Sequence, residues 1–168
     1  MKNKTVRLMC ISGVLVALVF VVTAYLHIPT VNGYIHVGDG LIYLAAAILP
    51  LPYAVAVGAG GALLADTLTG FAVWAPASVV IKGVSCLFFS SKGKRIITRR
   101  NVLAVLPAAL ICAGGYYLYE TLVYGSFSAS LVGIPASLTQ SLASTVLFIA
   151  VGLAIDKMKI KNKLIGGF

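Results

Sequence analysis

Long apolar segments dominate this chain and leave few architectures open to it. The segment from Leu8 to Leu26 contains no charged side chain, and it has about the 20 residues that a helix needs to cross the hydrocarbon core of a bilayer. Of all 168 residues, 60% are apolar and only 10% are charged, whereas soluble domains average about 25% charged residues. So few charged residues cannot cover a globule. The sequence therefore predicts an all-α, multi-pass membrane protein in contact with the lipid bilayer.

Prolines help to divide the apolar sequence into six transmembrane helices. Pro50 and Pro52 interrupt the stretch from Val37 to Gly70, because proline lacks an N–H donor and disfavours helical geometry in the residue before it. Pro76 suits the first turn of the helix that follows. The predicted helices cover residues 8–26, 38–49, 53–68, 76–89, 102–123 and 135–155, in a single integral membrane domain of residues 1–168. The first run is too long for a signal-peptide core and lacks a cleavage site, so we interpret it as a spanning helix.

Basic residues lie in three short runs that predict the orientation of the chain. These runs precede the first helix, separate the fourth from the fifth, and follow the sixth: Lys2, Lys4, Arg7; Lys92, Lys94, Arg95, Arg99, Arg100; Lys157, Lys159, Lys161, Lys163. The alternate connections, residues 26–37, 69–75 and 124–134, contain no lysine or arginine. Under the positive-inside rule both termini are cytoplasmic. The net charge of +9 is thus a topology signal, and we expect no nucleic-acid partner.

Lys82 is a lysine in an otherwise apolar helix. Such a residue costs roughly 2.5–3.5 kcal/mol at a helix centre, so it normally faces the protein interior or a wet cavity. Ser78 and Ser85 lie on the same helical face. Asp66 or Glu120 is the expected counter-charge, so Asp66 and Lys82 form a candidate structural ion pair. That interpretation and a role in ligand binding both remain open.

Polar and aromatic side chains on the later helices fall at depths comparable to that of Lys82. An acid, a base, an amide, hydroxyls and aromatic faces together suit a small planar polar molecule. Packing of the serines and an interfacial belt of aromatic residues are the structural alternatives. The candidate substrate-binding residues are Tyr34, His36, Asp39, Trp74, Ser78, Lys82, Tyr116, Tyr117, Glu120, Ser137, Gln140, Ser141 and Ser144.

Other chemistries find little support in the motifs. The loop of residues 28–40 contains Tyr34, His36 and Asp39 among glycines that would let it move as a lid, but two ligands without a third predict no metal site. The three cysteines are far apart in apolar stretches and are interpreted as buried hydrophobes. The chain has no phosphate-loop motif, no zinc-protease motif and no nucleophile elbow. We therefore expect no cofactor and no catalytic residue.

Three sequence blocks resemble the substrate-binding S components of energy-coupling factor (ECF) vitamin transporters. They are Tyr34-Ile-His-Val-Gly-Asp-Gly40, Gly60-Gly-Ala-Leu-Leu-Ala-Asp-Thr-Leu-Thr-Gly70 and Ala75-Pro-Ala-Ser-Val-Val-Ile-Lys-Gly83. The resemblance implies a non-enzymatic subunit of the bacterial plasma membrane that captures a vitamin from outside. It also implies a transmembrane coupling subunit and two ATPases as partners. Gly13 and Ala17 match the family's small-xxx-small docking motif on the first helix.

Within that family, the loop and lysine blocks are most similar to members assigned to vitamin B6 or to the hydroxymethylpyrimidine precursor of thiamin. Two other classes of protein are alternatives to this interpretation. A self-contained secondary transporter or small channel would show inverted repeats, and none is convincing here. A membrane enzyme would use Glu120 or His36 as acid or base.

Overall fold

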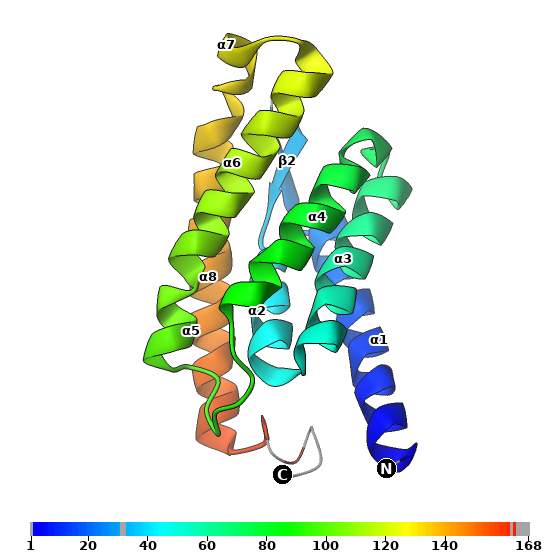
Figure 1. The fold of residues 1–168 in the computed structure, drawn as a ribbon, viewed down its shortest axis with the longest axis vertical. Coiled ribbons are helices and arrows are strands. Elements are labelled where there is room, and N and C mark those ends of the chain that lie inside the picture. The colour runs from blue at the N-terminus through cyan, green and yellow to red at the C-terminus, as the bar shows by residue number, and fades with distance from the viewer. Residues whose placement is uncertain (1, 31–32, 162, 164–168) are drawn as a thin grey trace.

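The computed structural model describes residues 2–30, 33–161 and 163, and helices dominate it (Figure 1). The described residues form the following elements in chain order: α1 Lys2–Tyr25, β1 His27–Thr30, β2 Gly33–His36, α2 Gly38–Ile48, α3 Leu51–Leu68, η1 Ala72–Trp74, α4 Ala75–Ser85, η2 Cys86–Phe88, α5 Arg99–Leu103, α6 Val105–Tyr124, α7 Phe127–Ser130 and α8 Gly133–Met158.

The predicted all-α, six-helix architecture is confirmed. In the described part of the chain, four helical stretches are long and apolar enough to cross a membrane, namely Lys4–Tyr25, Leu51–Leu68, Arg99–Tyr124 and Phe127–Met158. Two shorter apolar stretches, Gly38–Ile48 and Ala72–Phe88, correspond to the predicted second and fourth helices. The bounds differ mainly at the ends: α1 begins at Lys2, and the fourth helix ends in a 3₁₀ turn.

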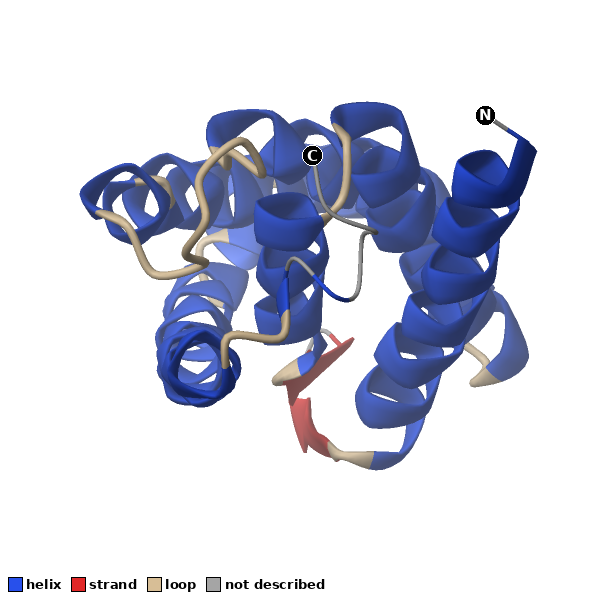
Figure 2. Cartoon of the chain, turned by 90° about the horizontal axis from the view of Figure 1, so that it is seen from below, coloured by secondary structure: helices blue, strands red, loops and turns tan. Residues whose placement is uncertain are grey.

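Two elements were not predicted. Residues 27–30 and 33–36, expected to lie in a loop, form two antiparallel strands in which His27 pairs with His36 and Ile28 with Ile35, and we call this pair of strands the hairpin. The short helix α7 lies in the connection before α8 and is capped by the Ser126 hydroxyl, which accepts a hydrogen bond from the Ala129 N–H at 3.3 Å. Figure 2 shows the hairpin between α1 and the rest of the bundle, and β2 packs on α8.

Helix α2 is the buried centre of the bundle. Of its 11 residues, all but Leu41 are buried, so this short helix contacts protein on every side instead of lipid. Its Tyr43 ring stacks on Phe89 at a centroid distance of 4.9 Å, and both rings meet Phe148 of α8 edge-on. This aromatic cluster belongs to the main hydrophobic core of the bundle.

The three basic runs gather at one end of the molecule. Figure 1 shows the start of α1, the connection between α4 and α5, and the end of α8 at that end, whereas α7 lies at the other. We call the end where these basic runs gather the basic end. That the basic end faces the cytoplasm stays a prediction from the charge distribution.

Candidate functional site

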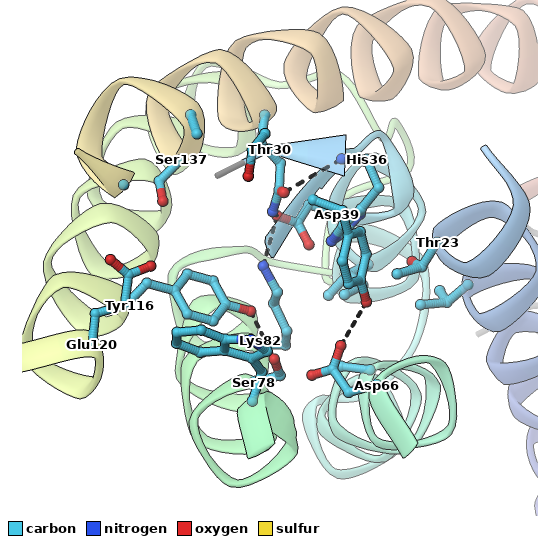
Figure 3. Close-up of a pocket in the computed structure, with 18 residues that line it drawn as sticks. Thr23, Thr30, His36, Asp39, Asp66, Ser78, Lys82, Tyr116, Glu120 and Ser137 are labelled. Carbon is cyan, nitrogen blue, oxygen red and sulfur yellow. Dashed lines mark hydrogen bonds and ion pairs between the residues drawn. The ribbon is translucent and has the colours of Figure 1, made fainter. Parts of the chain in front are cut away.

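A cavity of about 680 Å³, including its opening to solvent, lies in the half of the bundle away from the basic end. Its walls come from α1, the hairpin, α2, α3, η1, α4, α6 and α8. The lining residues are Val19, Thr23, Thr30, Tyr34, His36, Asp39, Ile42, Ala62, Asp66, Trp74, Ser78, Lys82, Tyr116, Glu120, Gly133, Ala136, Ser137 and Gln140. Figure 3 shows these side chains converging from different helices.

A buried ion pair lies at the centre of the cavity wall. The Lys82 Nζ donates to Asp39 Oδ2 at 2.8 Å, and both side chains are almost fully buried. The Gln140 Nε2 donates to the same oxygen at 2.9 Å. A buried charge pair of this kind is held by its additional hydrogen bonds, here from an amide of α8. The network therefore ties α2, α4 and α8 together beside the cavity.

The close approach of α2 to α8 makes this network possible. At Gly40, a Cβ would lie 2.6 Å from the Ser144 backbone oxygen, so a larger residue would push the two helices apart. Asp39 is therefore held within reach of Gln140, one turn before Ser144 on α8. The Gln140 Oε1 in turn lies 3.4 Å from the His36 N–H, which links the hairpin to the same network.

The expected ion pair of Lys82 with Asp66 or Glu120 is corrected by this geometry. Lys82 bonds Asp39, because Asp39 lies in the first turn of the central helix α2 and not in an outer loop. Asp66 instead accepts a hydrogen bond from the Tyr34 hydroxyl, at 2.6 Å to Oδ1. Tyr34 also packs on Phe71 at a centroid distance of 4.6 Å. Asp66 thus anchors the hairpin to α3.

Glu120 is seated against the start of α8. A Cβ on Gly133 would lie 2.5 Å from Glu120 Oε2 and 2.8 Å from Oε1, so any larger residue at this position would displace the carboxylate. Gly133 is the first residue of α8, and the N-terminus of a helix favours a negative charge. The Glu120 carboxylate therefore lies beside the first turn of α8.

Aromatic faces complete the cavity. The Tyr116 ring centroid lies 5.1 Å from Lys82 Nζ, and the Tyr116 hydroxyl lies 2.8 Å from the Ser78 hydroxyl. Trp74 packs on Tyr119 and Tyr124 at centroid distances of 5.8 and 6.2 Å. Tyr34 and Trp74 both line the cavity, so rings from the hairpin, η1 and α6 are available for stacking.

Most of the residues predicted as substrate-binding line this one cavity. They are Tyr34, His36, Asp39, Trp74, Ser78, Lys82, Tyr116, Glu120, Ser137 and Gln140. Tyr117, Ser141 and Ser144 are not among the lining residues. The Ser141 hydroxyl donates to the Ser137 backbone oxygen at 2.9 Å, and the Ser144 hydroxyl lies 3.5 Å from the His36 oxygen. These contacts agree with the structural alternative to ligand binding, in which the serines serve helix packing.

Several cavity residues were not predicted from the sequence. Asp66 was assigned to an ion pair and not to ligand binding, and Thr23, Thr30 and Gly133 were not considered. Cys112 Sγ also lies 3.5 Å from Lys82 Nζ. One signal was available for Asp39: an acid within a helix that is otherwise apolar requires a partner, as Lys82 does. Within the described residues, no group of three or more histidine, cysteine or acidic side chains is placed to hold a metal.

A bundle of apolar helices around a buried polar cavity defines the class of an integral membrane protein that binds a small solute. The chain belongs to the family described as ECF-type riboflavin transporter, S component, whose model matches residues 3–157. Comparison with curated proteins finds no match. The protein is therefore a multi-pass S component of a vitamin transporter, a substrate-binding subunit and not an enzyme. The family implies partners that form an ECF module, namely a transmembrane subunit and ATPases.

Proposed function

We propose that this subunit captures a small, flat nitrogen heterocycle of the vitamin B6 or hydroxymethylpyrimidine type. It takes the ligand from the membrane face opposite the basic end and presents it to a coupling subunit driven by two ATPases. The observation that supports this most is the cavity itself, where aromatic faces stand beside carboxylates and hydroxyls. Rings of Trp74 and Tyr116 suit stacking on a heterocycle, and Asp66, Glu120 and Ser137 suit its polar substituents.

Riboflavin is a second candidate ligand. The description of the matching family names it, and the match extends over residues 3–157. Riboflavin is also a flat nitrogen heterocycle with several hydroxyl groups, so the same aromatic and acceptor groups would suit it. The two candidates differ in size and substituents and are separated by direct binding measurements.

The binding test is thermal unfolding of the purified protein against a panel of riboflavin, three forms of vitamin B6, hydroxymethylpyrimidine and thiamin. We expect at least one compound to raise the melting temperature, because a ligand that binds only the folded state stabilises it. Trp74→Ala is expected to reduce this rise, whereas Tyr25→Ala, which truncates an aromatic residue that is 74% exposed on α1, is not. Folded protein that no member of the panel stabilises would contradict the proposal.

We also propose that Gly13 and Ala17 form the docking surface for the coupling subunit. Both residues are exposed on α1, and a Cβ on Gly13 would meet no atom within 4 Å. Small residues at this spacing let another helix approach closely. Gly13→Leu and Ala17→Leu should therefore abolish uptake in cells that also produce the ECF module while ligand binding remains. Val14→Leu, at a 61% exposed position on α1, is the control; uptake that survives both docking changes would contradict this assignment.

A further inference from the structure

Another pocket lies at the basic end, apart from the cavity described above. It measures about 620 Å³, including its opening to solvent. One wall comes from the connection between α4 and α5, and the other from the end of α8 and the residues that follow it. Hydrogen bonds of Asp156 and Lys161 hold these two segments together, and Figure 1 shows both at the basic end. The described lining residues are Lys94, Arg95, Ile155, Asp156, Lys159 and Lys161.

Positive charge dominates this pocket. Four of its described lining residues are lysine or arginine, and Asp156 is the single acidic one. Both Asp156 oxygens already accept from backbone N–H groups, those of Ile96 and Ile97. Within the described residues, none of the four cations forms a salt bridge with a carboxylate. The pocket therefore carries an excess of positive charge, which attracts anions.

Lys161 gives the pocket a buried cation in a fixed position. Its side chain is 2% exposed, and its Nζ donates to the Gly93 oxygen at 2.7 Å and lies 3.4 Å from the Arg95 oxygen. An ammonium group has three N–H donors, so these two carbonyl groups leave one donor for a ligand. Buried charges in proteins are normally paired, and an anion in the pocket would supply the missing counter-charge.

The position of the pocket indicates the kind of anion. Its α8 residues lie at the end of the stretch Phe127–Met158, and its basic residues from the connection come shortly before Arg99–Tyr124; both stretches are long and apolar enough to cross a membrane. The pocket thus lies where spanning helices leave the hydrocarbon, at the level of the lipid headgroups. Leu153 and Met158 are exposed apolar residues on the last turns of α8. Basic pockets between spanning helices bind the headgroups of anionic lipids.

We propose that this pocket binds the phosphate of an anionic phospholipid of the phosphatidylglycerol type. The Arg95 guanidinium suits paired hydrogen bonds to phosphate oxygens, and Lys161 adds a donor that the fold already holds in place. Lys94 and Lys159 complete the positive wall, and the acyl chains lie along the exposed apolar side chains at the end of α8. The bound lipid contacts both the connection and α8, so it stabilises the junction between them.

Lipids that differ in headgroup charge test the site on the unmodified protein. Protein purified in a non-ionic detergent and freed of lipid would be titrated with phosphatidylglycerol, phosphatidylcholine and glycerol 3-phosphate, with native mass spectrometry and thermal unfolding as readouts. We expect phosphatidylglycerol to bind at least roughly tenfold more tightly than phosphatidylcholine and to raise the melting temperature. Equal binding of the two lipids would overturn the proposal. A rise with glycerol 3-phosphate equal to that with phosphatidylglycerol would show a site for a soluble phosphate and would overturn the lipid as its ligand.

Two double variants of equal charge test the assignment to this pocket. Arg95→Gln with Lys159→Gln removes two exposed cations that line it, whereas Arg99→Gln with Lys157→Gln removes two exposed cations nearby that do not. Lys161 stays unchanged because its backbone bonds hold the connection. The first variant should bind phosphatidylglycerol roughly tenfold more weakly or worse, and the control should change by less than about threefold.

Melting temperatures without lipid would show that both double variants are folded. Equal losses of affinity in the two variants would mean a general attraction to the basic end and would overturn the pocket as the site. Wild-type affinity in the pocket variant would overturn it as well. Neither result depends on which vitamin the other cavity takes, because every measurement is made without vitamin.

Discussion

The carboxylates at the two ends of the bundle differ in the hydrogen bonds that they accept. At the basic end, Asp156 accepts from two backbone N–H groups, of Ile96 at 2.7 Å and of Ile97 at 2.9 Å, one on each oxygen. At the cavity, Asp39 and Asp66 each keep one buried oxygen that has no partner among the described residues. The chain has only four acidic residues, and the three others line the cavity. A carboxylate whose oxygens are both bonded holds the fold together, whereas one with an open oxygen can also bind a ligand.

The neighbours of Asp156 extend this comparison. Asn101 is fully buried and bonds the Ser90 N–H, the Ser90 oxygen and the Ile96 oxygen at 2.8–3.0 Å. Lys161 donates to the Gly93 oxygen at 2.7 Å. These bonds fasten the connection between α4 and α5 to the end of α8.

The largest expected effect comes from breaking the buried pair. Lys82→Met should destabilise the protein by about 3–5 kcal/mol, because removing one partner leaves an uncompensated buried charge on Asp39. Denaturant or thermal unfolding in detergent measures this loss. The double variant Lys82→Met with Asp39→Asn should recover part of the stability, since no charge is then left buried. An unfolding curve like that of the wild type in the single variant would contradict the structural importance of the pair.

The next effect should appear at the basic end. Asp156→Ala removes both acceptors of the Ile96 and Ile97 N–H groups, and a buried donor left without a partner costs about 1–3 kcal/mol. Stability should fall while the affinity for the ligand, measured where the protein remains folded, stays unchanged. A parallel loss of affinity would show that the two ends are coupled and would weaken the distinction between a structural and a binding carboxylate.

The sequence predicted the spanning helices well because the length of an apolar segment and the position of a proline are local features of the chain. It also placed Lys82 inside the protein correctly, since a lysine that faces lipid has a high free-energy cost. Its counter-charge was predicted wrongly because depth along separate helices does not reveal which helix is central. Asp39 was placed in an outer loop, but α2 is buried on nearly every side, and this position brings Asp39 to Lys82.

The hairpin and the cavity shape could not be predicted for a related reason. The pairing of residues 27–30 with 33–36 depends on α1 and α8 holding its two sides, and short strands give little local signal. Gly133 lay outside the predicted sixth helix, which began at residue 135, yet its missing side chain makes room for Glu120. Such close approaches are properties of the packed bundle and do not follow from spacing along the chain.

Tyr34→Phe tests the role of the Tyr34–Asp66 hydrogen bond at the cavity. It removes the hydroxyl that donates to Asp66 at 2.6 Å, and a hydrogen bond to a charged group contributes about 1.5–3 kcal/mol; we expect the lower limit because Tyr34 is only partly buried. Ligand affinity should fall as well, since Asp66 loses the group that orients it. Tyr119→Phe is the matched control, because Tyr119 donates to the Val73 oxygen at the same 2.6 Å but does not line the cavity. Equal effects of the two variants on affinity would contradict a specific role for the Tyr34–Asp66 bond.

The smallest expected effect concerns the seat of Glu120. Gly133→Ala places a methyl group 2.5 Å from the Glu120 carboxylate, so the side chain must move to a poorer rotamer at a cost of about 0.5–1.5 kcal/mol. Because Glu120 lines the cavity, ligand affinity should decrease more clearly than stability. Gly114→Ala on α6, where a Cβ would meet nothing within 4 Å, should instead raise stability by roughly 0.5–1 kcal/mol and leave affinity unchanged. If Gly133→Ala behaved like Gly114→Ala in both measurements, Glu120 would tolerate displacement and would not be a positioned ligand-binding carboxylate.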